Sequence, residues 1–137
     1  MRTQKEIRER LATYKGAKLI YFEGLGYIAW QFTTGENIEI LFIEVETHGQ
    51  GIGHGLIKKW LTEICVDGLK PYNSIIVWRL KKNVQAGHFY RSLGFKETEV
   101  SDLYVKECAV LSVINFEGLC QNLSINLNFG KSGYRTH

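Results

Sequence analysis

Apolar residues recur along the chain at two spacings, and the change from one to the other gives the order of the elements. Near the start, Ile7, Leu11 and Tyr14 are separated by four and three positions, which predicts an amphipathic helix over residues 3–15. Three runs rich in aromatic and β-branched residues follow, joined by short glycine-bearing connections. They predict an antiparallel meander of three strands at 18–23, 27–33 and 37–45.

The remainder of the pattern alternates helices with strands. From Ile52 to Cys65 the apolar residues keep to one side of a helix, which Gly68 and Pro71 then end. After it, the sequence predicts a strand at 74–80, a short helix at 84–93, and two strands at 95–100 and 104–114. The middle of the chain is therefore β-α-β-α-β.

Residues 115–137 are mostly polar, apart from one alternating run at 123–129. We therefore divide the chain into a domain at 1–114 and a C-terminal extension at 115–137 that contributes an extra strand and a tail. Alternation would bury Leu123, Ile125, Leu127 and Phe129 on one face of that strand, so it needs a partner. Because an open sheet edge can pair with a second chain, we expect a homodimer in which this strand joins the interface.

Composition narrows the class of protein. With 137 residues, 45% of them hydrophobic, the chain can form one ordered domain with a single core. Its 17 basic residues are interspersed with 14 acidic ones, which does not favour nucleic acid as a partner. The first ten residues are charged and no long apolar run occurs, so we expect a cytoplasmic protein with no membrane partner.

A cluster of glycines lies between the third predicted strand and the following helix, from His48 to Gly55. Unpaired N–H groups and the positive end of the helix dipole attract an anion there, and a diphosphate suits the geometry. Glycines let the backbone approach phosphate closely. Leu56 follows the cluster and no Gly-Lys-Ser/Thr ending is present, so neither the Walker A motif nor the dinucleotide fingerprint fits.

The cluster does fit the pattern Q/R-x-x-G-x-G/A, and a second segment, from Asn83 to Phe95, reads N-x-x-A-x-x-F-Y-x-x-L-G-F. Both segments resemble those of the GNAT superfamily of acyl-CoA-dependent N-acetyltransferases, and the resemblance covers residues 18–114. It implies an α/β (α+β) fold with a mixed, mainly antiparallel central sheet flanked by helices. About seventeen residues precede the meander, where the family usually carries a strand and two helices.

The resemblance also implies the function: transfer of an acetyl group from acetyl-CoA to a primary amine by direct attack on the thioester. The diphosphate would bind the glycine loop. The backbone of Ile43 would donate a hydrogen bond to the thioester oxygen, and that of Val45 would pair with the pantetheine arm. Asn83 would cap its helix or bond the pantetheine. The residues implied for the cofactor are Ile43, Val45, Gln50, Gly51, Ile52, Gly53, His54, Gly55 and Asn83.

Attack by an amine requires a base, because a free alkylamine is mostly protonated near pH 7. Glu39 lies eleven residues before Gln50, and its surroundings resemble the base-bearing strand of the histone-acetyltransferase branch. Glu44 is the rival, and strict alternation puts these two carboxylates on opposite faces of the strand unless a bulge intervenes. Tyr90 would inherit the role of protonating, or hydrogen-bonding to, the thiolate that leaves; the alternative is a core tyrosine.

Two other functions stay open at this point. A non-catalytic acyl-CoA-binding module would keep the loop without a working base, and the short stretch ahead of the meander favours it. An RNA-binding sheet has weak support from Tyr21, Phe22, Tyr27 and Trp30, but no RNP-type motif accompanies them. The histidines share no His-x-x-x-His helical face, so a metal site is not expected.

Overall fold

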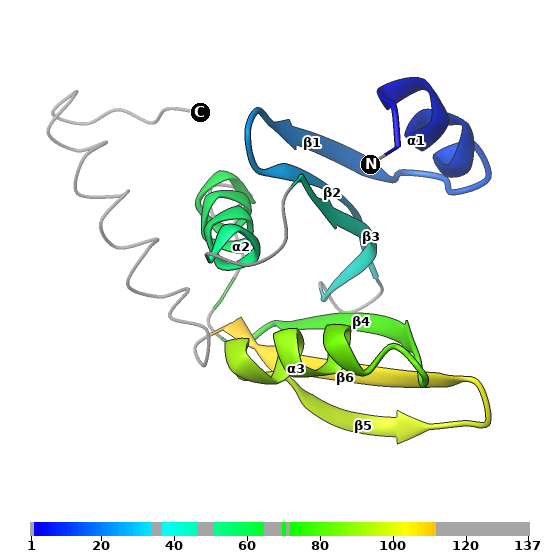
Figure 1. Cartoon of the computed structure of the whole chain (residues 1–137), viewed down its shortest axis with the longest axis vertical. Helices are drawn as coiled ribbons and strands as arrows, with labels where there is room; N and C mark the ends of the chain where they lie inside the picture. The colour runs from blue at the N-terminus through cyan, green and yellow to red at the C-terminus, as the bar shows by residue number, and fades with distance from the viewer. Residues whose placement is uncertain (1, 34–36, 47–50, 65–69, 71, 112–137) are drawn as a thin grey trace, which may run out of the picture.

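Figure 1 presents the computed structural model of the chain, which describes residues 2–33, 37–46, 51–64, 70 and 72–111. Three helices and six strands occur within these ranges. In chain order they are α1 (Gln4–Leu11), β1 (Lys18–Phe22), β2 (Gly26–Phe32), β3 (Ile38–Val45), α2 (Ile52–Ile64), β4 (Ser74–Leu80), α3 (Val84–Leu93), β5 (Lys96–Val100) and β6 (Tyr104–Val110).

The strands form one sheet in the order β1-β2-β3-β4-β6-β5. The pair β3–β4 is parallel, with α2 as its crossover, and the other four neighbouring pairs are antiparallel. This arrangement confirms the expected mixed, mainly antiparallel sheet flanked by helices. The extra strand expected at 123–129 lies outside the described residues.

The predicted elements agree with the observed ones to within four residues, and the ends of α1 and of β6, which stops at Val110, differ most. Thr3 caps this helix: its hydroxyl accepts from the Glu6 N–H, and Glu6 in turn accepts from the Thr3 N–H. The helix ends at Leu11, four residues earlier than expected. Tyr14 therefore lies beyond the helix, where its ring meets that of Phe42 edge-on.

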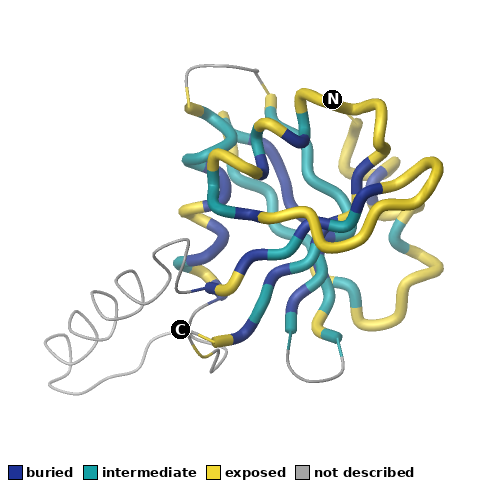
Figure 2. Tube along the Cα trace, turned by 90° about the horizontal axis from the view of Figure 1, so that it is seen from below, coloured by how far each residue is buried: buried dark blue, intermediate teal, exposed yellow. Residues whose placement is uncertain are grey.

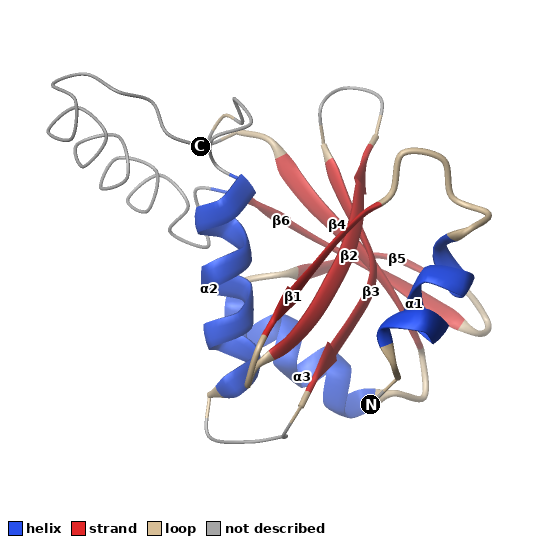
Figure 3. Cartoon of the chain, turned by 90° about the horizontal axis from the view of Figure 1, so that it is seen from above, coloured by secondary structure: helices blue, strands red, loops and turns tan. Residues whose placement is uncertain are grey.

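The helices cover opposite faces of the sheet. Figure 3 shows α2 and α3 on one side and α1 on the other. On the α2 side, Trp60 and its neighbours pack against Ile28, Trp30 and Ile40, while Ile7 of α1 is fully buried. Figure 2 shows the buried residues gathered along the central strands. No helix in the described ranges combines the length and apolarity needed to cross a membrane.

A β-bulge at Leu41 interrupts the alternation of side chains along β3. Ala29 of β2 lies opposite Phe42 and the next residue, Trp30, lies opposite Ile40, so Leu41 has no partner across the pair. The bulge reverses the phase of the strand. Glu39 and Glu44 consequently lie on the same face of the sheet, the α1 face, which corrects the strict alternation expected from the sequence.

Candidate functional site

The site begins where β3 and β4 separate. The two strands pair at three positions, Ile38↔Ile75, Glu39↔Ile76 and Ile40↔Val77, and then diverge. A cleft of about 710 Å³ opens between them, bounded also by α1, the first turn of α2 and α3. Its lining residues are Arg2, Arg10, Tyr27, Ile40, Leu41, Phe42, Ile43, Glu44, Val45, Gly53, Val77, Trp78, Arg79, Leu80, Asn83, Gln85, Ala86, Phe89 and Tyr90.

One wall of the cleft is an unpaired strand edge. Beyond Ile40, β3 is bonded only to β2, so its backbone facing β4 has no strand partner. Such an edge offers N–H and C=O groups to any extended molecule that carries amides. Ile43 and Val45 lie on this edge and line the cleft.

The described part of the glycine loop begins at Gly51 and reaches the cleft at Gly53. Gly51 has a φ of +73°, a conformation that glycine adopts at little cost, and α2 begins at the next residue, Ile52. Gly53 lines the cleft, whereas nothing lies within 4 Å of the position that a Cβ on Gly55 would take. The first-turn N–H groups of α2 thus lie beside glycines. Gln50 is outside the described residues.

His54 of α2 contacts two side chains of α3. His54 Nε2 lies 2.9 Å from Ser92 Oγ, and its ring meets Phe89 edge-on. His54 thus has a packing role between α2 and α3, and it is not among the residues that line the cleft.

Tyr90 lies on the inner side of α3, with its ring packed between those of Phe89 and Phe95. It is 5% exposed and lines the cleft, so it is both a core tyrosine and a candidate for the chemistry. Its hydroxyl donates no hydrogen bond to a described residue. Burial first, and the Glu107 carboxylate second, raise the pKa of Tyr90 to about 12.

Asn83 begins α3, as the sequence suggested. Its side-chain oxygen accepts from the Ala86 N–H at 3.1 Å, which satisfies one donor of the first turn. Because the cap uses only the oxygen, the Asn83 amide nitrogen remains available toward the cleft that this residue lines.

A carboxylate and two cations occupy the α1 side of the cleft. Glu44 accepts a hydrogen bond from the Tyr27 hydroxyl at 2.6 Å and lies 3.4 Å from Arg2. Burial raises the pKa of Glu44, but the bonds from Tyr27 and Arg2 outweigh it and lower the pKa below 4.5. Because its pKa is lowered, Glu44 is ionised at neutral pH. The second cation is Arg10, whose guanidinium lies 3.8 Å from the centre of the Phe42 ring.

Glu39, the base expected from the sequence, lies just before the strands separate. Its carboxylate accepts from Gln31 Nε2 of β2 at 3.1 Å, and it is not among the residues that line the cleft. Of the two candidate carboxylates, Glu44 is the one at the cleft.

Sequence reasoning missed a buried ion pair behind Tyr90, formed by Arg79 and Glu107. A signal was present, because each residue takes the place of an apolar one in an alternating strand: Ile75, Val77, Arg79 and Val105, Glu107, Ala109. Within the described residues no group of three or more His, Cys, Asp or Glu side chains could hold a metal ion.

Known proteins share this sequence pattern. A family model described as an acetyltransferase (GNAT) domain matches residues 11–97. A curated relative, the peptidyl-lysine N-acetyltransferase YjaB of Salmonella typhimurium, is 37% identical over 79 residues, which cover 56% of this chain and 49% of that protein. The chain thus spans about half the length of this relative.

Solved structures share the fold. Campylobacter jejuni N-acetyltransferase PseH, in complex with acetyl coenzyme A, matches with a TM-score of 0.59 and 16% identity over 77% of this chain and 76% of that chain. Ard1 from Thermoplasma volcanium matches with a TM-score of 0.58 and 19% identity over 80% of each chain. At these identities the likeness concerns the arrangement of helices and strands.

Proposed function

Because the chain belongs to the GNAT acetyltransferase domain family, we propose that it transfers an acetyl group from acetyl-CoA to a primary amine. The observation that carries the proposal is the cleft between β3 and β4: an unpaired strand edge, a glycine-flanked helix N-terminus at one end, and a tyrosine without a hydrogen-bond partner among the described residues. These are the features needed to hold a long molecule that carries amides and a diphosphate.

The residues of the cleft suit acetyl-CoA. The first N–H groups of α2, at residues 51–54, would take the diphosphate, whereas the Gly55 N–H already donates to the Gly51 carbonyl. The free edge of β3 at Ile43 and Val45 would pair with the pantetheine amides. Asn83 would add its amide nitrogen, and Gln50 belongs to the same proposed set. When bound, acetyl-CoA supplies a thioester whose carbonyl carbon is open to an amine.

On the α1 side we propose that a β3 carboxylate prepares the amine. Glu39 was the choice from sequence, and the placement of Glu44 in the cleft makes Glu44 the better one. As the amine nitrogen bonds to the carbonyl carbon it loses a proton, which an ionised carboxylate can accept directly or through water. A carboxylate also attracts the protonated form of the amine, which predominates near pH 7.

On the α3 side the C–S bond breaks and the sulfur leaves as a thiolate. Proton transfer from a phenol with a pKa of about 12 to a thiolate whose conjugate acid has a pKa of about 8.5 is unfavourable. We therefore assign Tyr90 as a hydrogen-bond donor that stabilises negative charge on sulfur. The proton that completes the thiol then comes from solvent.

The test is turnover with acetyl-CoA and a panel of amines, followed by the release of free thiol, alongside a thermal-shift measurement with CoA. The panel should contain lysine peptides, peptides with free N-termini, polyamines and aminoglycosides. Thiol release that depends on both acetyl-CoA and one class of amine establishes the activity. Stabilisation by CoA with no turnover on any class would instead identify a non-catalytic acyl-CoA-binding module.

Location and assembly are part of the same proposal. The enzyme proposed is cytoplasmic, and the alternating run at 123–129 supports a homodimer. In the described sheet β1 and β5 are edge strands, each with one neighbour. Light scattering on the full chain and on a truncation near Asn115 tests the dimer, which a full-length monomer or a dimeric truncation would refute.

A further inference from the structure

Arg79 and Glu107 form a buried ion pair directly under the first turns of α3. They come from neighbouring strands, β4 and β6, and lie diagonally across the pair, since Val77 is opposite Glu107 and Arg79 is opposite Val105. Their side chains are 7% and 0% exposed, and Arg79 Nε donates to Glu107 Oε2 at 2.5 Å. Burial of two charges is unfavourable, so an apolar pair would serve a core equally well.

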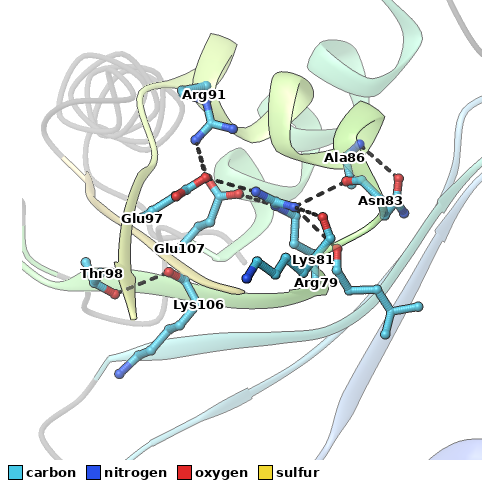
Figure 4. A network of polar contacts seen from close by, with 10 residues as sticks. Arg79, Lys81, Asn83, Ala86, Arg91, Glu97, Thr98, Lys106 and Glu107 are labelled. Carbon is cyan, nitrogen blue, oxygen red and sulfur yellow. Dashed lines mark hydrogen bonds and ion pairs between the residues drawn. The ribbon is translucent and has the colours of Figure 1, made fainter. Parts of the chain in front are cut away.

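The guanidinium reaches beyond Glu107 to the backbone that begins α3. Figure 4 shows its bonds fanning out from one point: one nitrogen donates to Glu97 at 3.0 Å, and another to three carbonyl oxygens. These carbonyls belong to Leu80 at 3.3 Å, Lys81 at 3.3 Å and Asn83 at 3.4 Å. All three nitrogens of Arg79 are therefore used, and most of the bonds hold the β4–α3 connection.

α3 contacts the Arg79 guanidinium at Gly87. A Cβ at this position would lie 2.8 Å from Arg79 Cζ and 2.9 Å from one of its terminal nitrogens, which is closer than real contacts allow. Because Gly87 has no Cβ, α3 packs directly against the guanidinium without displacing it. Tyr90 follows three residues later on the same side of the helix, and Asn83 lies at its start.

We propose, on the premise of the acetyl transfer proposed above, that Arg79 and Glu107 are positioning residues that fix Asn83 and Tyr90 against the cleft. Arg79 ties down the carbonyls of the connection and the first turn of α3, and Glu107 orients Arg79. The pair acts through Asn83 and Tyr90. A planar fork of donors is required, which a lysine ammonium does not provide.

The decisive variant is the double substitution Arg79→Met with Glu107→Leu, because it removes both buried charges together and leaves neither one buried without its partner. It should fold with a melting temperature close to that of the parent. We expect kcat to fall roughly 10- to 100-fold, since small misplacements of reacting groups carry losses of this size. The Kd for CoA should rise, and the Ala86 and Gly87 amides should exchange hydrogen faster.

Two single variants sharpen the test. Arg79→Lys keeps the charge beside Glu107 without the fork, so it should fold but recover little of the lost kcat. A kcat equal to that of the parent would show that the positive charge is enough and that the fork of donors is not required. Glu99→Gln is the matched control, because it removes an exposed ion pair between β5 and β6 that does not touch α3. Its kcat and exchange rates should equal those of the parent.

The outcomes separate this inference from the proposed function. A folded double variant with parental kcat, CoA affinity and exchange rates overturns the positioning role even though the enzyme is active. If the parent neither turns over any amine nor binds CoA, acetyl transfer fails, and exchange at Ala86 and Gly87 still decides whether the pair holds α3. Unchanged exchange in the double variant then overturns the inference.

Discussion

Gly53 of α2 lies against the ring of Phe89 of α3 so closely that a Cβ at residue 53 would fall 2.6 Å from Phe89 Cε1. This glycine therefore serves helix packing as well as any contact with a ligand. Gly55, two residues further along α2, has nothing within 4 Å of its Cβ position. The two glycines give the means to separate packing from phosphate binding.

We predict that Gly53→Ala destabilises the protein without ligand by about 1–3 kcal/mol, because Phe89 must move. Gly55→Ala should be tolerated or stabilising, since alanine favours a helix over glycine by about 1 kcal/mol. Urea unfolding of both variants measures the difference. Equal stability of the two would contradict the packing role of Gly53.

For the loop assignment, Gly55→Glu should remove most of the thermal shift by CoA, because its carboxylate takes the positive helix end proposed for the diphosphate. In the parent, CoA at a hundredfold excess over Kd should stabilise the native state by about 2.7 kcal/mol. Gly55→Gln, in which the new side chain is equal in size but neutral, should lose less of the thermal shift by CoA than Gly55→Glu does. If Glu and Gln variants respond alike, charge at this position is irrelevant and the diphosphate binds elsewhere.

Much of the fold could be predicted because apolar spacing and glycine positions agree. The strand at 74–80 and the helix at 84–93 were placed at their observed bounds, since Asn83 and Gly94 cap the helix and mark its ends clearly. The bulge at Leu41 could not be predicted. Residues 40–43 are all apolar, so the alternation carries no mark of the position where its phase reverses.

The site was predictable where it depends on backbone and less so where it depends on side chains. Asn83, Tyr90, Ile43 and Val45 are among the site residues proposed from the sequence, and all four line the cleft. The choice of Glu39 depended on its spacing from Gln50, and spacing along a strand does not say where two strands begin to diverge. That point is set by the pairing of Ile40 with Val77, a contact between residues far apart in the chain.

Tyr90→Phe should lower kcat roughly 10- to 150-fold, the equivalent of losing a hydrogen bond to a charged group worth about 1.5–3 kcal/mol. Binding of CoA should change little, because the bond forms to charge that develops during the reaction. Tyr104→Phe, on an exposed tyrosine of β6 outside the cleft lining, is the matched control. Equal kcat in Tyr90→Phe and the parent would leave Tyr90 as a core residue only.

Glu44→Gln should reduce kcat/KM for the amine by about 10²–10⁴-fold, the usual contribution of general acid–base catalysis. Glu39→Gln should have a much smaller effect, because Glu39 contacts Gln31 and not the cleft. Steady-state kinetics with a fixed saturating concentration of acetyl-CoA compares the two. The reverse order of effects would restore Glu39 as the base.

The last prediction concerns acid stability and depends on the bond from Tyr27 to Glu44. The pKa of Glu44 in the folded protein is below the ordinary value of 4.5, because the bonds from Tyr27 and Arg2 outweigh the burial that raises it. A lowered folded-state pKa stabilises the fold above pH 4.5, and this contribution is lost as the pH falls through the folded-state value. Tyr27→Phe raises the pKa of Glu44 and so should remove much of that contribution.

Unfolding free energies from pH 7 to pH 3 provide the measurement. The parent should exceed Tyr27→Phe by a constant amount from pH 7 down to about pH 5, and this excess should shrink below pH 4.5 as Glu44 takes up its proton. Tyr21→Phe is the matched control, because the Tyr21 ring stacks on Tyr27 but its hydroxyl bonds to the Arg2 carbonyl instead of Glu44. The excess of the parent over Tyr21→Phe should not vary with pH. If the unfolding free energy of the parent exceeds that of Tyr27→Phe by the same amount down to pH 3, the Tyr27 hydroxyl does not lower the pKa of Glu44. The two residues would then interact only by packing.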